Sequence, residues 1–127
     1  MESERALVLV VDDHELLRQL TARLLDGNGL EIVALGDAEE ALEVVRARGD
    51  ELAVLISDVS MPGVSGPRLG ELVRELCPGV PLLFITGFAA EAVAQQLPEG
   101  AQLLEKPFTR DDLLARVRAA RAADPRP

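Results

Sequence analysis

The chain has 127 residues, carries a net charge of −9 and contains one cysteine, Cys77. This length suits one domain, which buries roughly two-thirds of its unfolded surface and needs no disulfide to hold a core. A single cysteine excludes an internal disulfide and favours a reducing compartment, so we expect a cytoplasmic protein. The acidic balance disfavours nucleic-acid binding, and no apolar run approaches membrane-spanning length.

Short apolar runs alternate with helical patterns along the whole chain. Continuous runs of this kind predict strands that are buried on both faces, as in a parallel sheet covered by helices. The expected strands are 6–11, 31–36, 52–56, 80–86 and the short pair 103–104.

Between these runs, apolar residues recur at helical spacing, which predicts helices with one inward face. Asp37 with Glu40, and Thr109 with Asp112, have the spacing of helix-start capping boxes. The expected inward stripes are Leu16, Leu20 and Leu24; Ala38, Ala41, Leu42 and Val45; Leu69, Leu72, Val73 and Leu76; Ala90, Val93, Ala94 and Leu97; and Leu113, Leu114 and Val117.

The strand-then-helix unit therefore occurs five times. Right-handed crossovers turn such a series into a doubly wound α/β fold with a five-stranded parallel sheet. We expect one domain over 1–127, with a core of about 6–122 and short flexible ends.

Polar side chains follow the strands at their carboxyl ends, where open parallel sheets bind ligands. Asp12 and Asp13 follow the first strand, Asp58 the third, Thr86 ends the fourth, and Lys106 follows the last. Helix capping explains one aspartate, but three carboxylates in one crevice repel one another unless a cation neutralises them. Oxygen ligands of this kind favour Mg²⁺ over Zn²⁺.

Lys106 is the only lysine in the chain. A lysine is most often a surface residue, but this one stands between an apolar run and Pro107, at the edge of the expected sheet. Its compact ammonium suits contact first with a carboxylate and then with a phosphoryl oxygen, whereas the planar fork of an arginine does not.

These residues together resemble the receiver domain of bacterial two-component response regulators. The matching stretches are VVDDH (10–14), SDVSMPGVSG (57–66), ITGF (85–88) and LLEKPF (103–108). The resemblance implies a flavodoxin-like (βα)5 three-layer sandwich with strand order 2-1-3-4-5. It further implies a signalling domain that is not a conventional enzyme and catalyses only its own phosphorylation and dephosphorylation.

The resemblance also implies the role of each site residue. Asp58 would accept a phosphoryl group from the phosphohistidine of a histidine kinase or histidine phosphotransfer domain. Thr86 and Lys106 would contact that group, and the Lys106–Pro107 peptide would be cis. Mg²⁺ would be held by the carboxylates of Asp12, Asp13 and Asp58 and by the backbone carbonyl of Ser60.

One position departs from the family pattern. Many members carry Tyr or Phe three residues before the lysine as an inward-turning switch, and this chain has Leu103. We expect the output to run through the order of residues 89–97, whose helix is brief, rather than through an aromatic rotamer. Phe88 is a candidate for partner contact, and His14 is expected to be a solvated residue at a helix start.

Other classes fit less well. Haloacid-dehalogenase-type phosphatases carry a DxD motif on the first strand, and flavodoxins need a hydroxyl-rich phosphate loop there; this chain has Asp-Asp-His. A binding-only pseudo-receiver is the remaining alternative, although such domains usually lack one of the five site residues. The loops most resemble receivers fused to hybrid sensor kinases, and both a separate protein and a piece of a larger one remain open.

Overall fold

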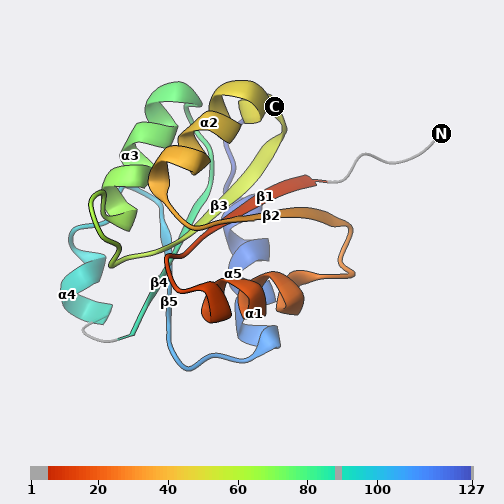
Figure 1. The fold of residues 1–127 in the computed structure, drawn as a ribbon, viewed down its shortest axis with the longest axis vertical. Helices are drawn as coiled ribbons and strands as arrows, with labels where there is room; N and C mark the ends of the chain where they lie inside the picture. Colours follow the sequence, from red (N-terminus) through yellow and green to blue (C-terminus); the bar gives the residue numbers. More distant parts are fainter. Residues whose placement is uncertain (1–5, 88–89, 127) are drawn as a thin grey trace.

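Within residues 6–87 and 90–126, which the computed structural model describes, five parallel strands form one sheet (Figure 1). Their order, β2-β1-β3-β4-β5, confirms the expected flavodoxin-like, doubly wound α/β fold. The first strand has the expected ends, and those of the other strands differ from the expected ones by at most two residues. The strands are β1 (Ala6–Val11), β2 (Leu30–Leu35), β3 (Leu52–Asp58), β4 (Leu82–Thr86) and β5 (Gln102–Glu105).

Helices cover both faces of this sheet. In Figure 1, α2 and α3 lie on one face and α1 and α5 on the other, while α4 lies beside β5 at the edge. The fourth helix has only five residues, as brief as the sequence predicts. The helices are α1 (Glu15–Leu25), α2 (Ala38–Arg48), α3 (Gly66–Leu76), α4 (Ala90–Ala94) and α5 (Arg110–Ala122), with a 3₁₀ turn, η1 (Gly49–Glu51).

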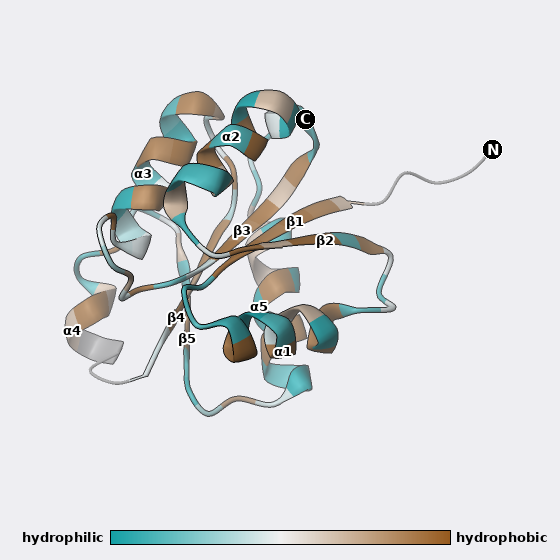
Figure 2. Ribbon diagram, viewed as in Figure 1, coloured by the Kyte–Doolittle hydropathy of each residue, from teal (hydrophilic) through white to brown (hydrophobic). Residues whose placement is uncertain are grey.

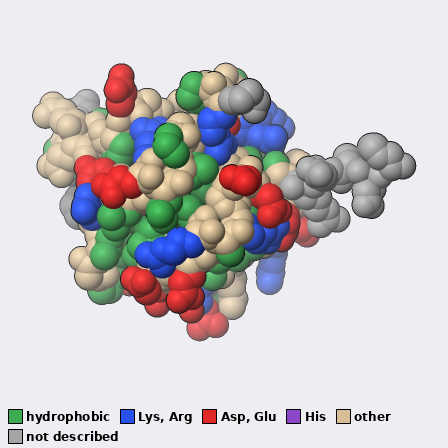
Figure 3. Space-filling model, turned by 90° about the horizontal axis from the view of Figure 1, so that it is seen from above, with side chains coloured by type: hydrophobic (Ala, Val, Ile, Leu, Met, Phe, Trp, Pro, Cys, Tyr) green, Lys and Arg blue, Asp and Glu red, His purple; other side chains and the backbone are tan. Residues whose placement is uncertain are grey.

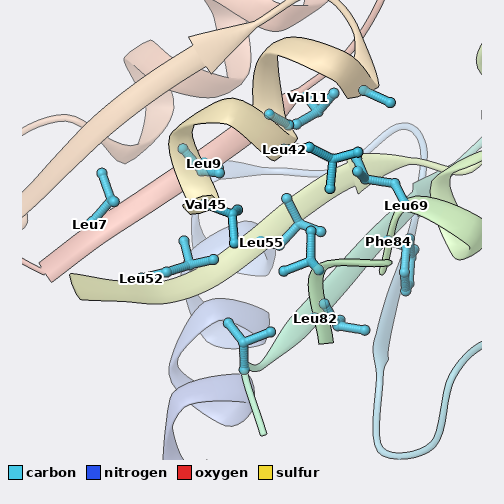
Figure 4. Close-up of a cluster of buried hydrophobic side chains, with 14 residues drawn as sticks. Leu7, Leu9, Val11, Leu42, Val45, Leu52, Leu55, Leu69, Leu82 and Phe84 are labelled. Atoms are coloured by element: carbon cyan, nitrogen blue, oxygen red, sulfur yellow. The ribbon is translucent and has the colours of Figure 1, made fainter. Parts of the chain in front are cut away.

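The strands are mostly hydrophobic, whereas the helices carry both hydrophilic and hydrophobic residues (Figure 2). Alternate residues of a strand point to opposite faces, so each strand supplies two cores. Val8 and Val10 pack towards α1 and α5. The opposite cluster, towards α2 and α3, contains the side chains labelled in Figure 4: Leu7, Leu9, Val11, Leu42, Val45, Leu52, Leu55, Leu69, Leu82 and Phe84.

The inward face of α1 differs from the expected one. Leu16 is 79% exposed and Leu20 is 51% exposed, so the predicted stripe is wrong at these two positions, whereas Leu24 is partly buried against the core; Thr21 and Leu25 are the buried residues of the helix. Leucines on two sides of this helix leave two possible inward faces. Packing against β2 and α5 selects the one that contains a threonine.

Two smaller corrections concern α3 and the caps. Leu76, expected to point inward, is 48% exposed because it stands at the last position of α3. Thr109 and Asp112 form the expected reciprocal capping box. The Asp37 side chain accepts from the Glu40 amide as predicted, but the Glu40 carboxylate accepts from Gly36 rather than from Asp37.

The chain beyond α5 folds back onto the end of the sheet. Arg126 donates to the Leu52 carbonyl at 2.7 Å and forms an ion pair with Asp124 at 2.8 Å. Its other terminal nitrogen lies 3.5 Å from Cys77 Sγ, and its side chain packs over Gly79. The composition of this segment offered no sign of these contacts.

Candidate functional site

The functional residues meet at the carboxyl edge of the sheet. Val11 pairs in register with Ser57, Asp58 with Ile85, and Thr86 with Glu105, so β1, β3, β4 and β5 end side by side. The residues that end or follow these strands therefore share one crevice, as the sequence predicts.

Three carboxylates and one imidazole lie together in this crevice. One oxygen each from Asp12, Asp13 and Asp58 and one nitrogen of His14 lie within 4.8 Å of one another. Asp12 and Asp58 are buried, whereas Asp13 and His14 are exposed. Buried carboxylates at this spacing repel each other, so the cluster is complementary to a cation.

His14 lies at the start of a helix, as the sequence indicates, and it also lies close to two carboxylates of the crevice. It is the N-cap residue directly before α1, and its side chain is 64% exposed. Its Nδ1 also lies 3.5 Å from an oxygen of Asp12 and 3.5 Å from an oxygen of Asp13. The signal for this contact was its position directly after the two acids, which the sequence reasoning did not use.

The only lysine lies beside the buried aspartate. Lys106 Nζ is 3.6 Å from Asp58 Oδ1, and the two side chains are 30% and 9% exposed. The Lys106 amide donates to the Thr86 carbonyl at 2.8 Å, which fixes the chain at the end of β5. The Lys106–Pro107 peptide is cis, as the resemblance implies.

The pKa of the Asp58 carboxyl is raised above its ordinary value. Burial is the main cause. The Lys106 ammonium acts in the opposite direction, and the charges of Asp12 and Asp13 add to the rise. The crevice is therefore short of positive charge, and its set of hard oxygen donors fits a divalent cation such as Mg²⁺.

The loop after β3 holds the backbone of Asp58. Ser57 Oγ donates to the Asp58 carbonyl at 2.9 Å, and the Gly66 amide donates to Val59 at 2.9 Å. A side chain at Gly66 would collide with the Asp58 carbonyl, so only glycine lets α3 begin this close to the site. Gly66 is the last residue of the motif at 57–66, but the sequence pattern did not predict this close contact.

Thr86 and Leu103 lie on the last two strands. Thr86 is buried, only 6% exposed, at the end of β4 and thus at the same edge as Asp58. Leu103 is half-buried in β5, opposite Phe84 in register and packed against the α2–α3 core. Phe88, the candidate for partner contact, lies outside the described residues.

The comparisons with known proteins identify the family of the chain. Residues 8–118 match the response regulator receiver domain family, and the chain belongs to it. Domains of this family are signalling modules of two-component systems. The fold and the acid crevice are those of this class of protein.

Individual relatives are similar over nearly the whole chain. The sensor kinase CckA of Brucella abortus is 34% identical over 118 residues, which cover 91% of this chain but 12% of that protein. The chemotaxis protein CheY4 of Vibrio cholerae superposes with a TM-score of 0.82 at 31% identity, covering 91% of this chain and 98% of that one. The receiver domain of the hybrid histidine kinase CckA gives 0.77 at 33% identity, covering 91% and 98%.

Two findings bear on other surfaces. None of the helices within 6–87 and 90–126 combines the length and apolar composition needed to cross a bilayer. On the face seen in Figure 3, which looks onto α2 and α3, acidic and basic side chains are interspersed around apolar ones. That face therefore carries charges of both signs rather than a single basic field.

Proposed function

We propose that the chain is a phosphoacceptor in two-component signalling and that Asp58 receives the phosphoryl group. The observation that carries this proposal is the contact of Lys106 Nζ with Asp58 Oδ1 in the crevice that also holds Asp12 and Asp13. All five residues that the chemistry requires, Asp12, Asp13, Asp58, Thr86 and Lys106, end or follow strands at the same edge of the sheet. The binding-only alternative has no observation in its favour.

The proposed reaction is an in-line displacement. An Asp58 carboxylate oxygen attacks the phosphorus of a partner's phosphohistidine; the P–N bond breaks, and its electron pair stays on the imidazole nitrogen. The Lys106 ammonium lies beside the Asp58 carboxylate before transfer, and from this position it can pair with an oxygen of the transferred phosphoryl group. Thr86 contributes a hydroxyl at the end of β4 as a further donor to that group.

Asp12, Asp13 and Asp58, with the backbone carbonyl of Ser60, would hold Mg²⁺. The ion, when bound, supplies positive charge that offsets the charge on the phosphoryl oxygens and on the clustered acids. The residues themselves hold the carboxylates close together and keep the Asp58 carboxyl largely out of water.

The first turns of α1 offer a surface for the phosphohistidine donor. Leu16, Leu17 and Leu20 are 79%, 37% and 51% exposed, and this helix begins directly beside the acid crevice. Exposed apolar side chains next to a reactive site are typical of a protein-binding surface. The donor in this proposal is a histidine kinase or histidine phosphotransfer domain.

The output belongs to the same proposal. Leu103 carries no ring that could turn inward, and α4 has only five residues, so the order of residues 89–97 is the proposed readout. Amide exchange that stays the same there on phosphorylation would contradict this.

A cytoplasmic location and one receiver domain over 1–127 remain predictions. The chain spans 12% and 24% of two of the relatives it matches, which leaves the whole protein's activity open.

Intact mass after incubation with acetyl phosphate tests the proposal. We expect a phosphoryl adduct that requires both Mg²⁺ and Asp58 and is absent from Asp58→Asn. Asp50→Asn, which removes a carboxylate outside the crevice, is the matched control and should react normally. If neither acetyl phosphate nor a panel of phosphorylated kinases labels Asp58, the chain is a binding-only pseudo-receiver.

A further inference from the structure

Arg18 reaches back from α1 to the loop that carries the first two acids. Its Nη1 donates to the Asp12 carbonyl at 2.9 Å, across six residues of sequence. The Arg18 amide donates to the His14 carbonyl at 2.9 Å, which places Arg18 in the first turn of the helix. The side chain is half-buried, so this contact is partly shielded from water.

A glycine just after the neighbouring strand leaves room for this guanidinium. Gly36 directly follows β2, and a Cβ built there would lie 2.9 Å from Arg18 Nη1 and 3.6 Å from Arg18 Cζ. Gly36 is not among the glycines with a positive φ. The lack of a side chain therefore matters for space, because a Cβ at this position would require the guanidinium of Arg18 to shift.

With Arg18 in place, Asp12 is held at three points. Its amide donates to the Leu35 carbonyl at 3.1 Å, its carbonyl accepts from Arg18, and its Oδ1 accepts from the His14 amide at 2.9 Å. These bonds fix both the backbone of the turn and the direction of the carboxylate. A carboxylate held in this way needs little rearrangement to act as a ligand.

We propose that Arg18, seated over Gly36, is a positioning residue for the acid crevice: it holds the turn in which Asp12 and Asp13 face Asp58. This inference rests on the proposed function for its biological meaning. The hydrogen bonds made by Arg18 and Asp12 involve no metal, so they can be tested in the metal-free protein as well.

The first test measures amide exchange in the metal-free protein. We expect the His14 amide, which donates to Asp12 Oδ1, to exchange faster in both Arg18→Ala and Gly36→Ala than in the wild type. Arg23→Ala changes an exposed arginine of the same helix and is the matched control, with wild-type exchange. Unchanged exchange of the His14 amide in folded Arg18→Ala would overturn the proposal.

The second test titrates the same variants with Mg²⁺ alone by calorimetry. Loss of a group that orients a ligand typically weakens metal binding about ten-fold or more, so we expect that rise in Kd for Arg18→Ala and for Gly36→Ala. Arg18→Lys, which keeps a donor, should recover part of the affinity. A purely structural role would lower the melting temperature and leave the Kd for Mg²⁺ unchanged, which would overturn the proposal.

The double variant Arg18→Ala, Gly36→Ala tests the link between the two positions. If Gly36 matters only because it seats Arg18, the double variant binds Mg²⁺ no more weakly than either single variant. Additive losses would contradict the seating of Arg18 over Gly36. A wild type that binds Mg²⁺ without being phosphorylated would end the proposed function, whereas the role of Arg18 would still be judged by these titrations.

Discussion

At the scale of single residues, the main feature of the site is the Asp58 carboxylate, whose negative charge is disfavoured by its surroundings. Asp58 is buried near Asp12 and Asp13, and only the Lys106 ammonium, at 3.6 Å, offsets these effects within the described part of the crevice. Functional sites commonly contain charged groups in unfavourable surroundings, and such groups lower the stability of the folded protein. The cost should be measurable in the folded protein.

Asp58→Asn is expected to stabilise the metal-free protein at pH 7. Burial raises the pKa of the Asp58 carboxyl above its unfolded value, so the unfolded state releases this proton first and stability falls as the pH rises through the interval between the two values. Asparagine removes that loss. The stability difference between variant and wild type should disappear below about pH 4, near the pKa of an aspartate in an unfolded chain.

Urea denaturation followed by circular dichroism at several pH values would measure this difference, since the chain has no Trp or Tyr. Asp50→Asn serves again as the control for removing a charge. An Asp58→Asn protein that is less stable than the wild type at pH 7 would show that the Lys106 contact outweighs burial.

At the scale of elements, two glycines let α3 lie close to the sheet. A side chain at Gly66 would meet the Asp58 carbonyl, and one at Gly70 would lie 2.9 Å from Phe84 Cζ and 3.0 Å from Leu82 Cδ1. The helix that follows the Asp58 loop is thus fitted closely to the strands at these two positions.

Gly66→Ala and Gly70→Ala are each expected to destabilise the fold by about 1–3 kcal/mol, the usual cost of overpacking. Gly66→Ala should show the larger loss because it meets rigid backbone rather than side-chain ends. Gly87→Ala is the control, since a Cβ there meets nothing within 4 Å. Equal urea midpoints for all three variants would contradict the close approach of α3.

The exposed face of α1 leads to a prediction about the partner rather than the fold. Leu16→Ala with Leu20→Ala should change stability by no more than about 0.5 kcal/mol, as for surface sites generally, yet slow phosphoryl transfer from a phosphorylated kinase. Labelling by acetyl phosphate should be unchanged, because that donor needs no docking surface. Leu25→Ala, which is fully buried, should instead cost about 2–5 kcal/mol. Equal loss with both donors would place the effect in the crevice and not in docking.

At the scale of the whole molecule, the end of the chain joins the N-terminal end of the sheet. Arg126 connects Asp124, Leu52 and Cys77, which come from three parts of the sequence. Cys77 Sγ also donates to the Gly49 carbonyl at 3.2 Å. The segment after α5 therefore covers the single thiol.

Arg126→Ala is expected to speed the reaction of Cys77 with a thiol reagent such as dithionitrobenzoate. Because Cys77 is the only cysteine, one rate reports this contact. Arg121→Ala, on the exposed side of α5, is the control and should react at the wild-type rate. A wild-type rate in Arg126→Ala would show that the tail does not shield the thiol.

The sequence alone determined the fold class and the acids of the crevice, although it did not indicate the contact of His14 with them. Continuous apolar runs fix which segments are strands, and residues at the carboxyl ends of parallel strands meet at one edge whatever the details of packing. Asp12, Asp13, Asp58, Thr86 and Lys106 could therefore be found from their places in the chain. The strand order came from the resemblance to a family, and the structure and the family match confirm it; the residue roles came from the same resemblance and stay predictions.

Only the tertiary structure decided which face of α1 turns inward, because leucines on two sides of that helix give equal local patterns and contacts from other elements choose between them. The same holds for Arg18 over Gly36 and for Arg126 on Leu52, where a long side chain meets backbone from a different part of the sequence. Periodicity and strand ends are properties of neighbouring residues. The partner of a flexible cation depends on distances that only the folded chain sets.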